Sequence, residues 1–135
     1  AKGSSAAAAP PQRSSHEATI AWRANPEESH TLHGIFEEAA AKYPKEICVK
    51  TVGHQGLTFD QVARAVNRCA AHVATLDEEI IGLVAARSYE MIVMIVAVLK
   101  TGKAYCPVEP DYPAARAELI LQGGGVQHAL VPFGQ

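Results

Sequence analysis

The chain has 135 residues, of which 48% are hydrophobic and 19% are charged, and such values are ordinary for one globular domain with a single core. A formal net charge of −2 at pH 7 provides no basic surface field, which argues against nucleic acid and anionic membranes as partners. The longest apolar run, residues 91–99, is about half of the roughly 20 residues that a membrane-crossing helix needs.

The first 28 residues are rich in Ala, Ser and Pro, and they contain too little apolar surface to offset the entropy lost on folding. We therefore expect a flexible linker over residues 1–28 and a folded domain over residues 29–135. A transit peptide is the alternative, but three acidic residues in this segment argue against it: Glu17, Glu27 and Glu28. Because the chain begins at Ala1 and not at a methionine, we also expect it to come from a longer or processed protein.

An amphipathic helix is predicted after Thr31, because apolar residues recur there at helical spacing until Pro44 stops the pattern. A strand is predicted over residues 47–52, followed by a turn at 54–56 and by a second short strand that ends at Leu57. The apolar stripe of the helix consists of Leu32, Ile35, Phe36, Ala39, Ala40 and Tyr43.

A second helix is expected to start after Thr58, because Thr58 and Gln61 have the spacing of a reciprocal capping box. Its apolar positions again follow helical spacing and end at Val73. Residues 80–85 then form an uninterrupted apolar run, which is typical of a strand buried on both faces. The stripe of this second helix is Val62, Ala65, Val66, Cys69, Ala70 and Val73.

Ser88 can cap the next predicted helix, which covers residues 89–100. This helix is apolar on every side, so we expect other elements to cover more than one of its faces. Gly102 provides a left-handed end to the helix, and residues 104–108 are predicted to form the following strand.

The stretch that follows is expected to be extended and stiff, because prolines fix φ and remove backbone donors at Pro107, Pro110 and Pro113. Pro113 should open a helix that continues to about residue 122, the glycines at 123–125 should end it, and residues 129–131 are predicted to form a last strand. Strands that alternate with helices of this length predict an α/β fold with right-handed crossovers and a largely parallel sheet.

No local pattern predicts a catalytic, cofactor-binding or metal-binding residue, and we therefore expect none of the three. The glycines at 123–125 follow a helix and do not connect a strand to a helix, so they are interpreted as a helix end and not as a phosphate-binding loop. Ser88 lacks the Gly-x-Ser-x-Gly elbow of an activated serine. The acidic runs at 37–38 and 77–79 are interpreted as solvated surface.

The histidines and cysteines likewise predict no metal-binding or catalytic site. Six histidines lack a carboxylate at metalloenzyme spacing and are expected on the surface: His16, His30, His33, His54, His72 and His128. Three cysteines are odd in number, far apart and set in apolar segments, as is typical of reduced core thiols: Cys48, Cys69 and Cys106. Reduced thiols indicate a cytoplasmic protein.

Two segments resemble core motifs of amino-acid adenylation domains. Residues 99–108, LKTGKAYCPV, together with PDYP at 110–113, look like the second core motif, L-K-x-G-x-A-Y-x-P with a trailing Pro-Tyr-Pro. Residues 57–62, LTFDQV, are similar to the first core motif. On these residues the chain is identified as the N-terminal portion of an adenylate-forming fold. The form Ala-Tyr-x-Pro at 104–107 favours the nonribosomal peptide synthetase type.

The sequence also departs from the family pattern at several positions. Lys103 stands where glycine is common, Cys106 where valine is common and Glu109 where aspartate is common. The connection around residues 75–77 is shorter than expected, and the glycines at 123–125 replace acidic and serine residues.

The resemblance implies that a complete domain uses ATP and Mg²⁺ to activate an amino or aryl acid and passes the acyl adenylate to the phosphopantetheine thiol of a carrier protein. The family's phosphate loop, ribose-binding aspartate and catalytic lysine would lie beyond this sequence. The fragment alone is therefore expected to be inactive and to bind no cofactor, with Lys100 and Lys103 at scaffold positions. The implied partners are the remainder of the domain and a carrier protein, and we expect self-association through exposed apolar surface.

Two alternatives stay open at this point. The chain is either a truncated, non-catalytic remnant that serves as a structural or interaction module in a larger synthase, or a fragment of a general acyl-CoA ligase.

Overall fold

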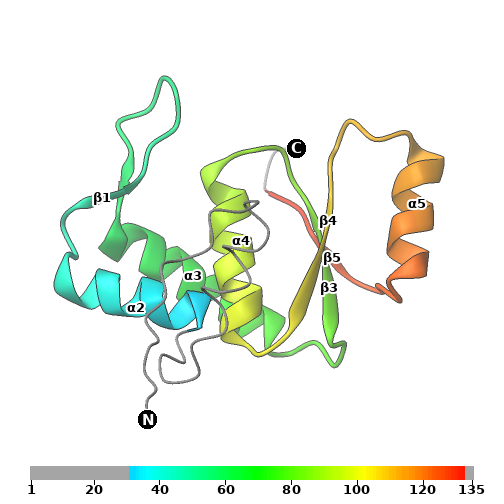
Figure 1. Ribbon diagram of the computed structural model, residues 1–135, viewed down its shortest axis with the longest axis horizontal. Helices are drawn as coiled ribbons and strands as arrows, with labels where there is room; N and C mark the ends of the chain where they lie inside the picture. The colour runs from blue at the N-terminus through cyan, green and yellow to red at the C-terminus, as the bar shows by residue number, and fades with distance from the viewer. Residues whose placement is uncertain (1–30, 133–135) are drawn as a thin grey trace, which may run out of the picture. The chain divides into compact units, whose positions relative to one another are not determined.

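A computed structural model describes residues 31–132, so the linker predicted over residues 1–28 lies outside the described residues, as do His16 and His30. Figure 1 shows the arrangement of the helices and strands. In chain order they are α2 (Leu32–Lys42), β1 (Ile47–Val49), β2 (Leu57–Thr58), α3 (Phe59–Val73), β3 (Ile80–Val84), α4 (Tyr89–Lys100), β4 (Ala104–Val108), α5 (Ala114–Gly123) and β5 (Ala129–Leu130).

A three-stranded parallel sheet in the order β4-β3-β5 confirms the predicted α/β class. The central strand β3 pairs with β4 at five consecutive positions, from Ile80 opposite Ala104 to Val84 opposite Val108. It pairs with β5 at only two positions, Gly82 opposite Ala129 and Leu83 opposite Leu130. Since each pair adds to the ladder, β5 is the less extensively bonded of the two outer strands.

The helices α4 and α5 lie on opposite faces of this sheet (Figure 1). Side chains of a strand alternate between the two faces, and β3 shows the alternation directly. Ile81 and Leu83 are buried in one cluster with Met94 of α4. Gly82, between them, faces Leu121 of α5 on the other side.

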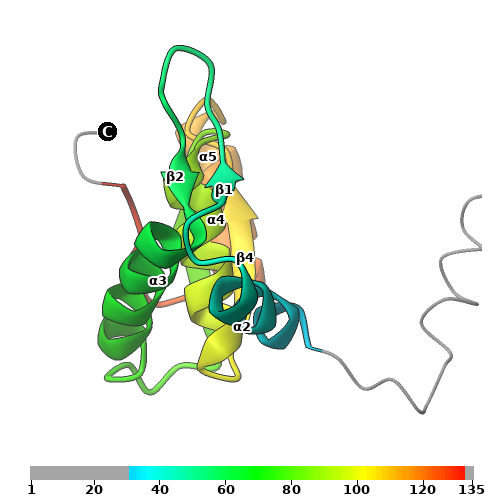
Figure 2. The same cartoon turned by 90° about the vertical axis from the view of Figure 1, so that its left-hand side faces the viewer.

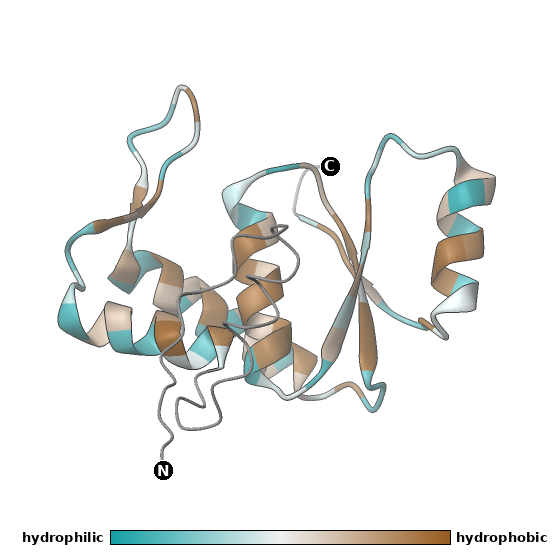
Figure 3. Ribbon diagram, viewed as in Figure 1, coloured by the Kyte–Doolittle hydropathy of each residue, from teal (hydrophilic) through white to brown (hydrophobic). Residues whose placement is uncertain are grey.

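Most of the helix α4 is hydrophobic (Figure 3), and it is buried on two sides, as its all-round apolar sequence predicts. One cluster of buried side chains lies between α4 and the sheet, and it includes Met94 and Val98 of α4. A second cluster lies between α4 and α3, and it includes Val93 and Ala97 of α4. Figure 2 shows α3 and α2 on the side of α4 that faces away from the sheet. The two clusters together fix α4 between the sheet and the outer helices.

The predicted helix ends are confirmed by their capping contacts. The Gln61 N–H donates to Thr58 Oγ1 at 3.2 Å and the Thr58 N–H donates to Gln61 Oε1 at 2.9 Å, which completes the capping box at the start of α3. The Met91 N–H donates to Ser88 Oγ at 3.4 Å at the start of α4. Gly102 follows α4 with φ of 79°, the left-handed conformation expected of it.

The strand predicted over residues 47–52 is wrong in its second half. β1 ends at Val49, because β2 has only two residues and gives the backbone beyond Val49 no strand to pair with. Residues 50–56 instead form a loop that projects away from the helices (Figures 1 and 2). Two glycines with positive φ shape this loop, Gly53 at 83° and Gly56 at 91°, and Val52 is 99% exposed.

The ends of three other predicted strands also change by one residue, since β2 ends at Thr58, β3 at Val84 and β5 at Leu130. Such one-residue differences are usual at the ends of elements. Within residues 31–132 no helix is long and apolar enough to span a membrane.

Candidate functional site

The carboxyl edge of the parallel sheet is the part of the fold where a ligand site is expected. In open α/β sheets, ligands bind beyond the carboxyl ends of strands whose following helices lie on opposite faces. The order β4-β3-β5 is the 2-1-3 order of a doubly wound sheet, in which the ligand crevice lies between the first and the third strand of the chain, here β3 and β5. The chain beyond β3, residues 85–88, and beyond β5, Val131 and Pro132, therefore borders the candidate site.

The polar groups at this edge are engaged in holding the start of α4. Ser88 Oγ accepts the Met91 N–H, so the hydroxyl serves as a helix cap. Burial by itself would raise the pKa of Glu90, but hydrogen bonds from the Ser88 side chain and from the backbone outweigh it and lower the pKa. A hydrogen bond with this carboxylate raises the pKa of Tyr89. The base next to the serine hydroxyl is the Glu90 carboxylate, and its lowered pKa makes it a weak base, so the arrangement stabilises a helix start and does not activate the serine.

A groove of about 430 Å³ lies between the hairpin loop and the first turns of α4. Val52 on one wall and Ile92 on the other are exposed apolar side chains. Lys50 and Arg87 also line the groove, and no carboxylate does. Its lining is suited to contact with a protein segment, because exposed apolar side chains lie there beside two cationic ones.

Lys100, in the segment that resembles the second core motif, joins three helices. Its Nζ atom lies 2.5 Å from Glu37 Oε1 of α2 and donates to Asn67 Oδ1 of α3 at 2.8 Å. The hydrogen bond from Lys100 lowers the pKa of Glu37. The lysine thus ends α4 in a polar contact with both outer helices.

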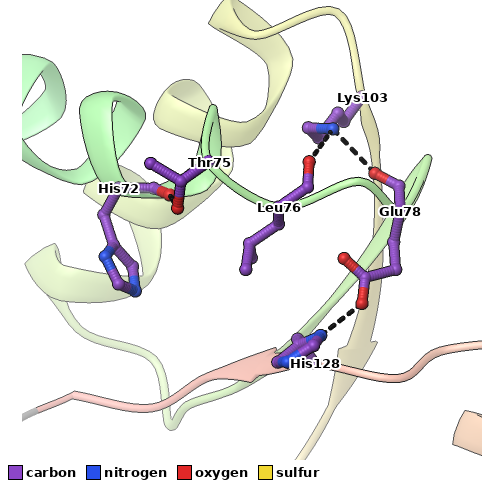
Figure 4. Close-up of polar contacts among 6 residues, drawn as sticks. All are labelled: His72, Thr75, Leu76, Glu78, Lys103 and His128. Atoms are coloured by element: carbon purple, nitrogen blue, oxygen red, sulfur yellow. Dashed lines mark hydrogen bonds and ion pairs between the residues drawn. The ribbon is translucent and has the colours of Figure 1, made fainter.

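Lys103, three residues later, contacts a loop and not the outer helices. Its Nζ atom donates to the carbonyl oxygens of Leu76 and Glu78, each at 2.8 Å (Figure 4). Both carbonyls belong to the connection between α3 and β3. Lys103 and this short connection are two of the departures from the family pattern, and the structure brings them into contact.

Two prolines of the same segment, Pro107 and Pro113, stand where neither the sheet nor the helix needs a backbone N–H donor. The Ala104 N–H donates to the Glu79 carbonyl at 2.8 Å, so the backbone groups of alternate residues, Tyr105 and Pro107, point toward the outer edge of β4. Pro107 therefore removes a donor from the outer edge and not from the ladder. Pro113 stands at the N-cap position of α5, which begins at Ala114.

The described histidines and cysteines form no metal site, since residues 31–132 contain no group of three or more His, Cys, Asp or Glu side chains that could hold a metal ion. The three cysteines are free thiols and partly buried. Burial raises the pKa of Cys48 and Cys69, so both thiols are protonated at neutral pH and are poor nucleophiles.

One polar pair is not indicated by the sequence. His128 Nδ1 contacts the Glu78 carboxylate, although the sequence patterns predict solvated surface for both residues (Figure 4). The two lie 50 residues apart in the chain, so no local spacing could indicate the pair.

Solved structures share the fold of this chain. The N-terminal subdomain of NpsA from Klebsiella oxytoca has a TM-score of 0.68 and 19% identity, and the match covers 77% of this chain and 28% of that one. The nonribosomal peptide synthetase FmoA3, solved in an α-methyl-L-serine-AMP bound form, has a TM-score of 0.72 and 24% identity over 78% of this chain and 12% of that one. The described residues therefore have the fold of the N-terminal part of an adenylate-forming domain.

The family is shown by sequence as well. The model of the AMP-binding enzyme family matches residues 36–133, and the chain belongs to that family. This confirms the identification made from the two motif segments.

The curated relatives are peptide synthases. A plipastatin synthase from Bacillus subtilis is 36% identical over 110 residues, which are 79% of this chain and 4% of that protein. Tyrocidine synthase 3 from Brevibacillus parabrevis is 39% identical over 105 residues, 75% of this chain and 2% of that protein. The chain thus spans only a few per cent of the length of these relatives.

Proposed function

We propose that this chain is part of an adenylation domain that activates an amino or aryl acid for a nonribosomal peptide synthetase. The observation that carries the proposal is the family match over residues 36–133, which contains both motif segments on the expected fold. In the proposed reaction a carboxylate oxygen attacks the α-phosphorus of ATP, the acyl adenylate forms and pyrophosphate leaves. A carrier-protein thiol then attacks the acyl carbon and releases AMP.

In this proposal, the described residues supply the framework of the domain and not its reacting groups. Lys100, Lys103 and Pro107 support this role, because each makes its contacts with neighbouring helices, loops or strands. Residues 31–132 do not by themselves fit Mg²⁺, since they bring no cluster of metal ligands together. ATP and Mg²⁺ would be bound by the complete domain, and no step of the reaction is assigned to residues 31–132.

The proposed organisation is a linker over residues 1–28 followed by the N-terminal portion of the domain over residues 29–135. The proposed partners are the remainder of the adenylation domain and a carrier protein that bears phosphopantetheine. Exposed apolar side chains support the first of these contacts and would also permit self-association. They include Leu32, Ile35, Ile92, Leu119 and Val131. A cytoplasmic location is proposed because the free cysteines fit a reducing compartment.

The test is exchange of labelled pyrophosphate into ATP by the full-length protein, measured with a panel of amino and aryl acids. Exchange that depends on one acid supports carboxylate activation, and a folded protein that shows none with any acid contradicts it. The second measurement is transfer of the activated acid. Loading onto a phosphopantetheine carrier protein is expected, whereas transfer to free coenzyme A would identify a general acyl-CoA ligase.

A further inference from the structure

The amino edge of the sheet holds a polar contact that involves the starts of all three strands. Lys103 directly precedes β4, His128 directly precedes β5, and Glu78 lies two residues before β3. Figure 4 shows the three side chains converging at this edge. Glu78 is the shared partner, because its backbone carbonyl accepts a hydrogen bond from Lys103 and its carboxylate contacts His128.

The environment of Glu78 separates this contact from an ordinary surface ion pair. The Glu78 side chain is only 13% exposed, although the His128 side chain is 58% exposed. Hydrogen bonds from its own backbone N–H and from His128 lower the pKa of Glu78, and the nearby charge of Lys103 adds to the effect. Lys103 also donates to the Leu76 carbonyl at 2.8 Å, which fixes the connection that carries Glu78. Lys103 thus holds the backbone on both sides of Asp77, and the Glu78 carboxylate at its end contacts His128.

Within residues 31–132, the strand β5 makes few other contacts with the sheet. It contributes two residues to the sheet, and the Gly82 N–H donates to the His128 carbonyl at 2.9 Å where the strand begins. Of its side chains, Leu130 is partly buried against the core and Ala129 is exposed. β4, by contrast, has five register positions and the buried Val108. A contact made at the first residue before β5 is therefore a large share of what attaches this strand within the described part of the chain.

We propose that Glu78, His128 and Lys103 form a clasp that holds β5 on the sheet. When the clasp is broken, β5 and the residues just before it detach from β3, while α3, α4 and β4 stay folded. The clasp is a conformational device, because the position of β5 determines where the chain arrives at the carboxyl edge between β3 and β5. It does not depend on the proposed catalytic function, since it concerns only how one strand is held.

Amide hydrogen exchange provides a direct test, because two backbone hydrogen bonds report on the two outer strands separately. The Gly82 N–H is protected by the carbonyl just before β5, and the Ala104 N–H at the start of β4 is protected by the Glu79 carbonyl. The variants are His128→Gln and Glu78→Gln in the full-length protein. Matched controls are His72→Gln and Asp77→Asn, which change residues of similar chemistry at exposed positions outside the clasp.

We expect exchange at Gly82 to become about 3- to 10-fold faster in both clasp variants, with exchange at Ala104 and in α3 unchanged, since local openings are governed by the contacts of the opening segment. The two controls should leave all these rates as they are. Unchanged exchange at Gly82 would overturn the proposal. So would equal acceleration at Gly82, Ala104 and α3, because the contact would then stabilise the whole fold and not β5. A clasp variant that fails to fold counts as the same adverse result.

Discussion

The Nζ atom of Lys100 lies 2.5 Å from the Oε1 atom of Glu37, so the last residue of α4 is joined to the middle of α2. This contact matters for α2, because no residue of that helix is buried. The helix is held by partial packing, chiefly of Phe36 against the cluster between α3 and α4, and by this polar contact.

Replacement of Lys100 by methionine should therefore loosen α2. The side chains of Lys100 and Glu37 are 34% and 47% exposed, so solvent screening limits the expected loss to about 0.5–1 kcal/mol of unfolding free energy. Urea unfolding followed by circular dichroism measures it. Lys45→Met, at an exposed position between α2 and β1, is the control and should have no effect. Equal midpoints for the two variants would contradict the role given to Lys100.

Gly82 should not tolerate a side chain. A Cβ atom there would lie 2.9 Å from the Ala129 Cβ, 3.1 Å from Leu121 Cδ2 and 3.1 Å from Val126 Cγ1. Gly82→Ala should destabilise the fold by about 1–3 kcal/mol, because β5 and α5 must move away from β3. Gly123→Ala is the matched control, because a Cβ added there has no atom within 4 Å apart from its chain neighbours and the backbone of its own helix. If the two variants have the same unfolding free energy, β5 does not approach β3 as closely as the structure shows.

The capping box of α3 should contribute measurably to stability. Thr58→Ala removes the acceptor of the Gln61 N–H, and the loss of such a cap costs about 0.5–2 kcal/mol. Thermal and urea unfolding both report the change. Thr51→Ala in the hairpin loop removes a hydroxyl from an intermediate position outside the helices and should cost little. A larger effect at Thr51 than at Thr58 would contradict the capping role.

The contribution of Glu78 should depend on pH in a defined direction. Its pKa is lowered in the folded protein by its own backbone N–H, by His128 and by Lys103. A lowered folded pKa means that the stabilisation is present above the unfolded value, about 4.3 for glutamate, and is lost as the pH falls through the folded value. Hydrogen exchange should therefore show the Gly82 N–H better protected in wild type than in Glu78→Gln at pH 6, and the difference should shrink toward pH 3. A difference that grows on acidification would contradict the assignment.

The elements that the sequence predicts well are those whose signals are local. α4 and β4 have the predicted bounds, because Ser88 caps the helix and Gly102 ends it within a few residues of the apolar pattern. The box formed by Thr58 and Gln61 is equally local. The strand prediction is wrong over residues 50–52 because strand length depends on a partner, and β2 ends after two residues.

The contacts at the amino edge could not be predicted for a different reason. Lys103 and Glu78 are 25 residues apart, and Glu78 and His128 are 50 residues apart. Only the fold brings them together. The sequence does mark Lys103 and the short connection around Leu76 as unusual for the family, and the structure supplies the physical link: the lysine amine binds the carbonyls of that connection. Such paired departures are the signal that the sequence offers for this contact.

The central claim is that residues 31–132 provide framework for an adenylation reaction whose reacting groups come from elsewhere. The most direct test is acid-dependent exchange of pyrophosphate into ATP by the full-length protein carrying Lys100→Met or Lys103→Met, with the folded fraction measured in parallel. Removal of a group that stabilises a transition state typically costs about 10²–10³ in rate. The account predicts that exchange per folded molecule stays within about 3-fold of wild type, with an unchanged KM for ATP, and a loss of about 100-fold in a fully folded variant would contradict it.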